Sequence, residues 1–253
     1  MENEEVVAGP ENWVRRPVKV NKNAAARPGT WVRRLVRVVA LASVALVALY
    51  VAASLIWRFS GSNQWELARD QDGVKVYTLK APGSDLIQAK GVTQVHSTLG
   101  GLVKLMTDPS TCDGAGCHAE SNNRVDEWLE YASFTIDLPF PFQNREFAIR
   151  SHIHQDPRTK EILVVVGAAP DRFPPNDCCF RVTEMNNTWR FTPLENGLVE
   201  VEFVYNLNLG GYIPVLLMNT QRPKRVADAL LAMKDMLPKK KYQDAKLDYI
   251  KER

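Results

Sequence analysis

One uncharged, mostly apolar run, residues 38–57, limits what this chain can fold into more than any other feature. The twenty residues of the run include no charged residue, no Pro and no Gly. An α-helix rises about 1.5 Å per residue, so a helix of this length spans the hydrocarbon core of a bilayer, about 30 Å. A helix of a soluble domain usually keeps a polar face, which this run lacks. We therefore predict a transmembrane helix over residues 38–57.

A cleaved signal peptide is the alternative interpretation of this run, with residues 51–53 (Val-Ala-Ala) as the cleavage site. The 37 residues before the run are far more than the usual n-region of a signal peptide. The apolar sequence also continues past that site to Trp57. We favour an uncleaved single-pass anchor.

Basic residues are unequally distributed around the run. The basic residues within fifteen positions before it are Arg27, Arg33, Arg34 and Arg37, and those within fifteen after it are Arg58 and Arg69. Positive charge stays on the cytoplasmic side of a membrane. This predicts a cytoplasmic N-terminus and a C-terminal domain on the outer, periplasmic or extracytoplasmic side.

The charge of the remaining chain bears on its partners. Residues 1–37 carry eight Lys and Arg against four Asp and Glu, whereas residues 59–253 carry 23 against 25, a net charge of −2. A near-neutral domain without a basic face argues against a nucleic-acid partner. The basic charge accompanies the membrane segment, so we interpret it as a topology signal.

Residues 65–238 show the pattern of an antiparallel sheet with two helices. Alternating apolar and polar residues predict strands, most clearly at residues 73–77, 145–153 and 198–209. Residues 99–106 have helical spacing, and a longer helix follows Pro214 and should kink or restart at Pro223. The sheet must bury its apolar face, and the last helix is the only large element that can cover it.

Four motifs in this region carry a family resemblance. They are Trp65 with GVKVY at residues 73–77, PFPFQNREF at 139–147, WRFTP at 189–193 and NLGGYIP at 208–214. In this order the motifs are similar to those of START domains, the steroidogenic acute regulatory protein-related lipid-transfer family. The chain resembles a membrane-anchored, bacterial-type member. It departs from the family pattern at Asn208 and Leu209, where Asp-Pro is common, and the usual N-terminal helix of the domain is absent or replaced by the membrane span.

The resemblance implies an α/β (α+β) helix-grip fold. In this fold a curved antiparallel β-sheet wraps round a long C-terminal α-helix and encloses a tunnel for one lipid-sized molecule. We expect a disordered basic cytoplasmic tail (1–37), a transmembrane helix (38–57), a short tether (58–64), a START-like lipid-binding domain (65–238) and a basic C-terminal tail (239–253). In that tail, residues 239–241 are three consecutive lysines, which we expect to be solvated.

The ligand-binding candidates are residues expected on the concave face of the sheet or on the last helix. They are Tyr131, Arg145, Phe147, Ile149, Ser151, Phe203, Tyr205, Leu207, Leu217 and Thr220. The same side chains could instead fill an ordinary core. For Arg145 we favour a structural pair with a nearby acid over ligand contact, because a buried arginine is costly unless it is paired.

Four cysteines are the disulfide candidates: Cys112, Cys117, Cys178 and Cys179. An oxidising compartment allows them to pair, and we expect at least one disulfide. Closure between the vicinal Cys178 and Cys179 is less favourable than Cys112–Cys117 or a bridge between the two pairs. Cys112 and Cys117 precede His118 but have the wrong spacing for haem attachment, and nothing fixes a zinc site, so we expect neither cofactor nor metal.

No catalytic motif is present. The four histidines are not accompanied by a nucleophile elbow, and no glycine-rich phosphate loop occurs. We therefore expect a non-enzymatic, membrane-anchored protein that binds or transfers one lipid or sterol-like molecule. The alternatives are an enzyme of cyclase or hydrolase type that uses the same cavity, and a scaffold whose cavity is closed.

Overall fold

The computed structural model describes residues 29–112 and 116–253. Most of the predicted cytoplasmic tail, residues 1–28, and the loop residues 113–115 lie outside the described part. The chain divides into two compact units, Met1–Ala52 and Ala53–Arg253. Each unit is described by itself.

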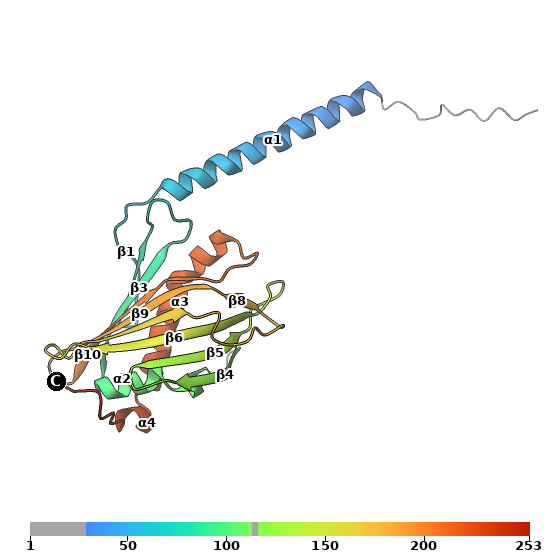
Figure 1. Ribbon diagram of the computed structural model, residues 1–253. Helices are drawn as coiled ribbons and strands as arrows, with labels where there is room; N and C mark the ends of the chain where they lie inside the picture. Colours follow the sequence, from blue (N-terminus) through green and yellow to red (C-terminus); the bar gives the residue numbers. More distant parts are fainter. Residues whose placement is uncertain (1–28, 113–115) are drawn as a thin grey trace, which may run out of the picture. The chain divides into compact units, whose positions relative to one another are not determined.

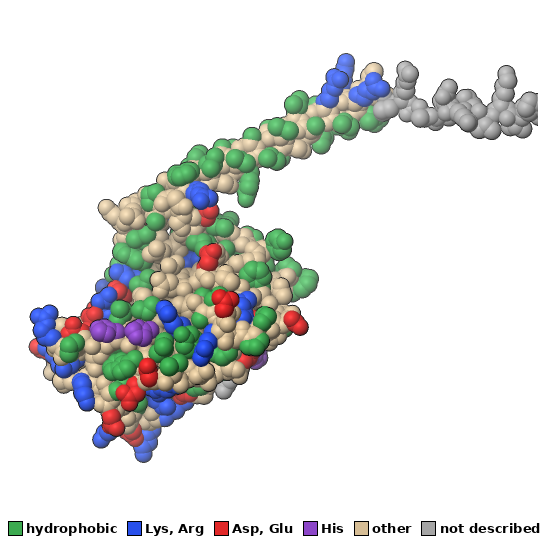
Figure 2. Space-filling view, in the orientation of Figure 1, with side chains coloured by type: hydrophobic (Ala, Val, Ile, Leu, Met, Phe, Trp, Pro, Cys, Tyr) green, Lys and Arg blue, Asp and Glu red, His purple; other side chains and the backbone are tan. Residues whose placement is uncertain are grey.

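Helix α1 (Thr30–Phe59) contains the predicted membrane segment and extends beyond it at both ends. It begins eight residues before residue 38, because nothing between Thr30 and the apolar run interrupts a helix. None of its residues is buried, and hydrophobic side chains cover its surface (Figure 2). It is long and apolar enough to cross a membrane, which is consistent with a single-pass anchor.

The second unit is built on an eleven-stranded sheet (Figure 1). Its main path runs β1-β2-β3-β10-β9-β7-β6-β5-β4, with antiparallel neighbours; β11 pairs with β9 and β8 lies parallel to β6. The strands are β1 (Glu66–Gln71), β2 (Val74–Leu79), β3 (Gln88–His96), β4 (Cys117–Arg124), β5 (Leu129–Ile136), β6 (Arg145–Gln155), β7 (Ile162–Ala168), β8 (Phe180–Val182), β9 (Glu184–Pro193), β10 (Leu198–Tyr205) and β11 (Leu207–Asn208).

Helix α3 (Val215–Met236) packs across β2, β3 and β10 on the inner face of this sheet. Its close approach depends on Gly91 of β3. A Cβ atom there would lie 2.5 Å from Leu230 Cδ1 and 2.6 Å from Val226 Cγ1. The curved antiparallel sheet and the C-terminal helix confirm the predicted helix-grip fold.

Alternation along the strands places one side of each in the core. On β10, Val199, Val201 and Phe203 are buried, and Phe203 stacks on Trp189 of β9 with ring centroids 3.9 Å apart. Helix α3 adds Val226 and Leu230, both with no measurable exposure. This aromatic and aliphatic core joins the sheet to the second half of the helix.

Pro223 was predicted to kink or restart the last helix, and the helix does not restart there. Helix α3 is one element with Pro223 inside it. Its neighbours Arg222 and Val226 are both buried. Tertiary packing on either side therefore outweighs the helix hydrogen bond that proline cannot make.

Three smaller helical segments complete the domain: α2 (Leu99–Met106), the 3-10 turn η1 (Pro109–Thr111) and α4 (Lys240–Gln243). The prediction of a basic tail after residue 238 is not met, because this segment packs on the domain. Tyr242 and Ile250 are buried, and the Glu252 carboxylate accepts hydrogen bonds of 2.9 Å from the Leu99 and Gly100 N–H groups at the start of α2. Two well-separated apolar side chains are too weak a periodic signal to reveal this in the sequence.

The three consecutive lysines also differ from expectation at one position. Lys241 Nζ lies 2.8 Å from Asp108 Oδ2, and the Tyr242 hydroxyl donates to the same oxygen at 3.0 Å. Burial alone would raise the pKa of the Asp108 carboxyl, but hydrogen bonds from Lys241, Ser110 and Tyr242 hold that pKa well below its usual range. An ion pair thus fastens the C-terminal segment to the turn after α2.

Candidate ligand pocket

Arg145, at the end of the PFPFQNREF motif, cross-links two loops beside the last helix. Its side chain is 2% exposed and donates to the carbonyl oxygens of Leu209 at 2.7 Å, Gly210 at 2.9 Å and Gln143. The predicted acidic partner was wrong: the partners are backbone carbonyls. Burial lowers the pKa of Arg145, but a guanidinium remains charged in proteins. Arg145 therefore fixes the turn that leads into α3.

The neighbouring acid, Glu146, points to the other side of β6 and pairs elsewhere. Its buried carboxylate lies 2.5 Å from Arg181 Nη2, and the Asn176 N–H also donates to it. Burial favours the neutral acid, but these hydrogen bonds lower the pKa of Glu146 overall. Strand alternation explains why adjacent Arg145 and Glu146 serve opposite faces.

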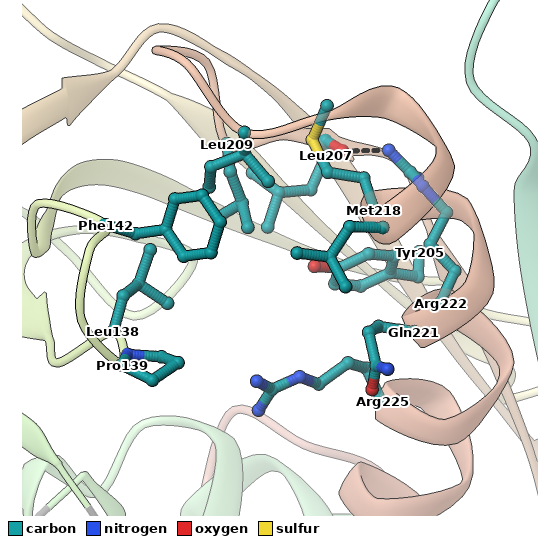
Figure 3. Close-up of a pocket in the computed structure, with 12 residues that line it drawn as sticks. Leu138, Pro139, Phe142, Tyr205, Leu207, Leu209, Met218, Gln221, Arg222 and Arg225 are labelled. Atoms are coloured by element: carbon teal, nitrogen blue, oxygen red, sulfur yellow. Dashed lines mark hydrogen bonds between the residues drawn. The ribbon is translucent and has the colours of Figure 1, made fainter.

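A cavity of about 270 Å³ lies between the loop that precedes β6, strands β10 and β11, and the first half of α3 (Figure 3). Most of its wall is apolar. The lining residues are Leu138, Pro139, Phe142, Tyr205, Leu207, Leu209, Ile213, Leu217, Met218, Gln221, Arg222 and Arg225. We call it the α3 cavity.

Polar groups in the α3 cavity come from Tyr205 and from one side of α3. Arg222 is 3% exposed, donates to the Leu207 carbonyl, and lies with its guanidinium carbon 5.4 Å from the Tyr205 ring centroid. Among the described residues, its Nε and Nη1 have no hydrogen-bond partner. Burial lowers the pKa of Arg222 and raises that of the Tyr205 hydroxyl. Arg225 is exposed and extends across the space between α3 and Pro139 (Figure 3).

A second cavity, of about 410 Å³, lies between the end of α2 and strands β4, β5 and β6. It shares no described lining residue with the α3 cavity and is more polar. Glu130 is one of its lining residues, and burial raises the pKa of this carboxyl. Phe134 lines this second cavity and stacks on Phe147, with centroids 4.9 Å apart, while Phe147 packs with Leu207 of the first. The aromatic pair therefore separates the two spaces.

The ligand-binding candidates divide among several environments. Tyr205, Leu207 and Leu217 line the α3 cavity, whereas Ile149 and Ser151 line the second cavity. The single predicted tunnel is thus two spaces within the described residues.

The remaining candidates line neither cavity. Phe147 and Phe203 are buried in the core. Tyr131 faces the other side of the sheet, opposite Arg150 and under the guanidinium of Arg172. Thr220 is exposed and donates to the Leu217 carbonyl.

Sequence reasoning missed the loop residues Leu138, Pro139 and Phe142, and it missed Arg222. Loop residues carry no periodic signal. Arg222 did have one, because it follows Met218 by four residues and precedes Val226 by four. That spacing places a charged residue on the buried stripe of the helix.

The four cysteines form two disulfides, Cys112–Cys117 and Cys178–Cys179. The first is a predicted pairing and borders the second cavity. The second is the vicinal closure that we considered less favourable, and it lies in the loop before β8. In residues 29–112 and 116–253, no group of three or more His, Cys, Asp or Glu side chains is arranged to hold a metal ion.

Comparison with known proteins connects this architecture to one fold. No protein-family model matches the chain. An uncharacterized protein of Pseudomonas aeruginosa is 27% identical over 182 residues, which cover 69% of this chain and 89% of that protein.

Solved structures give the clearer result. A STAR-related lipid transfer protein from Xanthomonas axonopodis, a fragment, has a TM-score of 0.63 at 23% identity and matches 69% of this chain and 99% of its own. Human STARD10 has a TM-score of 0.59 at 12% identity, covering 68% and 72% of the two chains. The lipid transfer and protein localization domain of human StarD13 also reaches 0.59, at 14% identity and 77% and 97% coverage. The domain that follows the apolar helix has the fold of START domains.

Proposed function

We propose that this protein is a membrane-anchored binder of a hydrophobic, lipid-like molecule, which it holds in the α3 cavity. The observation that carries the proposal is a mostly apolar cavity at the first half of the C-terminal helix of a START fold. Each methylene group moved from water into such a space contributes about 0.8 kcal/mol. Apolar walls with a few converging polar groups are typical of small-molecule sites.

Exposed apolar side chains surround this cavity. Phe140 is 96% exposed, Tyr212 is fully exposed and Leu216 is 75% exposed. Each is a chain neighbour of a lining residue: Pro139, Ile213 and Leu217. Exposed apolar clusters mark surfaces that contact membranes or partners. We infer that this end of the domain meets the bilayer, which supplies and accepts the ligand.

Contacts inside the Ala53–Arg253 unit support the same placement. Trp57 Nε1, near the end of α1, donates to the Asp85 carbonyl at 3.0 Å. Asn219 Nδ2, on the first half of α3, donates to the same oxygen at 2.9 Å. One loop thus connects the end of the apolar helix with the part of α3 that lines the cavity. A short tether would keep that part of α3 close to the membrane.

Release is proposed to widen the mouth of the cavity, where the lining residues Pro139, Leu217, Gln221 and Arg225 are already exposed. The loop before β6 and the turn before α3 are the natural moving parts, and Arg145 joins them. Opening of such loops is a common gating step. We propose that the ligand enters and leaves between this turn and the loop around Pro139.

We further propose that the N-terminus is cytoplasmic and the domain lies outside. The arginines before residue 38 favour this orientation. Two disulfides support it, since disulfides persist in oxidising compartments.

Binding is favoured over catalysis by the composition of the cavity. Its described lining contains no His, Cys, Asp or Glu, the groups that most often act as nucleophile or general base. His152 and His154 are exposed on the opposite face of β6. We therefore propose a binding protein and no enzymatic reaction.

The test fills the cavity. Leu217→Trp places a large side chain against a space of about 270 Å³, while Leu216→Trp adds the same bulk at the adjacent exposed position. Full-length protein in nanodiscs is analysed for co-purified lipid and for uptake of a fluorescent fatty acyl probe. We expect Leu217→Trp to lose uptake and Leu216→Trp to keep it. Equal uptake by both variants and wild type, or no lipid in any of them, would contradict the proposal.

A further inference from the structure

Arg222 is a buried cation with only one hydrogen-bond partner and no ion pair among the described residues. Its side chain is almost completely removed from water and lines the α3 cavity. A guanidinium has five N–H donors and cannot be deprotonated in proteins. Leaving such a group buried without partners is costly, so buried arginines are normally paired.

The partners of Arg222 within the described residues are few. One Nη2 donor reaches the Leu207 carbonyl, and Nε and Nη1 have none. None of the ion pairs in residues 29–112 and 116–253 includes Arg222. The group therefore offers unused donors beside an apolar space.

Two other arginines of this domain have hydrogen-bond partners for their guanidinium groups. Arg145 donates from Nε, Nη1 and Nη2 to backbone carbonyls. Arg181, at β8, binds the Glu146 carboxylate and three carbonyls. Arg222 is the exception, and it is the one of the three that lines the α3 cavity.

Two other polar side chains, Tyr205 and Arg225, also line the cavity. The Tyr205 hydroxyl is directed into the α3 cavity, and Arg225 extends across it (Figure 3). The Tyr205 hydroxyl is a further hydrogen-bond donor beside Arg222, and Arg225 adds a second positive charge to the wall of the cavity. The described lining holds no carboxylate that would compete.

We propose that the ligand of the α3 cavity is a single-chain amphiphile with an anionic head, a carboxylate or a phosphate, which Arg222 binds through the N–H donors that Leu207 leaves free. This rests on the proposed function and names the chemical class of its ligand. Leu207 accepts from one of the two Nη2 hydrogens, so one edge of the guanidinium keeps a free pair of parallel N–H donors, which match two oxygens of either head group. The cavity, about 270 Å³, is just below the range of about 300–1,000 Å³ usual for small-molecule sites, so it suits one chain rather than two.

The test compares ligands that share one ten-carbon chain and differ only in the head group. Full-length protein in phosphatidylcholine nanodiscs is titrated with decanoate, decyl phosphate and decanol, with empty nanodiscs as the blank. We expect at least one of the anionic ligands to bind about 10–100-fold more tightly than decanol, the range for hydrogen bonds to a charged group. The order of decanoate and decyl phosphate tells a fatty acid from a phosphate head.

Three variants test whether Arg222 causes the preference for an anionic head. Arg222→Gln should remove the preference for an anionic head and leave decanol binding in place. Lys224→Gln is the matched control, because it removes one positive charge from an exposed position of the same helix; it should keep the preference. Arg222→Lys keeps the charge without the paired donors and should lose about 10-fold, so the question is decided even if Arg222→Gln fails to fold.

The outcomes separate this inference from the function on which it rests. Equal affinity of wild type for decanol and both anions, or an unchanged preference in Arg222→Gln, overturns the anionic head while the hydrophobic site stands. Failure of all three ligands to bind overturns both. Equal losses in Arg222→Gln and Lys224→Gln would show that general charge, and not the buried guanidinium, is responsible, and this too overturns the proposal.

Discussion

The two halves of the inner sheet face are filled in different ways. Over β2, β3 and β10, helix α3 lies so close to the sheet that no side chain larger than that of Gly91 fits at position 91. Over β5, β6 and β11, two cavities remain, with the Phe134–Phe147 pair between them. One helix cannot cover a sheet of eleven strands. Loops and turns cover the rest, and they leave space.

Helix α3 itself changes character along its length, on either side of Pro223. After it come Val226, Leu230 and Met233, which are buried in the core. Before it come Met218 and Arg222, which line the α3 cavity. The same helix therefore closes one half of the fold and provides a binding wall in the other.

The largest expected effect on stability is in the closed half of the domain, where α3 packs on β2, β3 and β10. Leu230→Ala removes a fully buried side chain between α3 and β3 and should cost about 2–5 kcal/mol in free energy of unfolding. Leu216→Ala, on the exposed face of the same helix, should stay within about 0.5 kcal/mol. Denaturant unfolding followed by tryptophan fluorescence measures both. Similar values for the two variants would mean that this half is not closely packed.

A smaller effect is expected in the open half. Ile149→Trp adds bulk at the wall of the second cavity and should cost less than about 1 kcal/mol, below the usual penalty of overpacking a filled core. It should also leave uptake of a hydrophobic ligand unchanged, because the ligand is assigned to the α3 cavity. Loss of uptake in this variant would show that the two cavities act as one tunnel. A penalty near that of Leu230→Ala would show that no open space exists there.

The sequence predicted the fold well and the site only in part, for reasons that particular residues make clear. Strand alternation and the motif order pointed to the sheet and the last helix, because both signals are local. The inward face of residues 198–209, which form β10 and β11, was predicted correctly, and Tyr205 and Leu207 on that face line the α3 cavity. Tyr131 was assigned to the wrong face of a strand whose two sides are equally mixed.

Contacts between distant segments could not be predicted. Arg145 required a partner, but two of its carbonyl partners lie in a turn 64 and 65 residues later, and carbonyls are present in every sequence. The C-terminal segment looked like a tail because its two buried apolar residues, Tyr242 and Ile250, are far apart in the sequence. The separation of the cavities depends on the stacking of Phe134 on Phe147, which is decided by side-chain packing and not by pattern.

The last expected effect depends on pH and lies at the border between the closed half and the second cavity, at Asp108. Its carboxylate binds Lys241 and Tyr242 of the C-terminal segment. Because the pKa of Asp108 is lower in the folded protein than its ordinary value of 3.8, its contribution to stability is complete above that value and is lost as the pH falls further.

Asp108→Asn should therefore destabilise the protein by about 1 kcal/mol at pH 7, as for a partly exposed ion pair. The difference from wild type should shrink when urea unfolding is repeated near pH 3. Asp228→Asn is the matched control, because its exposed pair with Lys224 should contribute little at any pH. A difference for Asp108→Asn that persists unchanged at pH 3 would assign its role to shape and neutral hydrogen bonding. The C-terminal segment would then be held by burial of Tyr242 and Ile250 and by hydrogen bonds such as those of Glu252, without a contribution from the Asp108 charge.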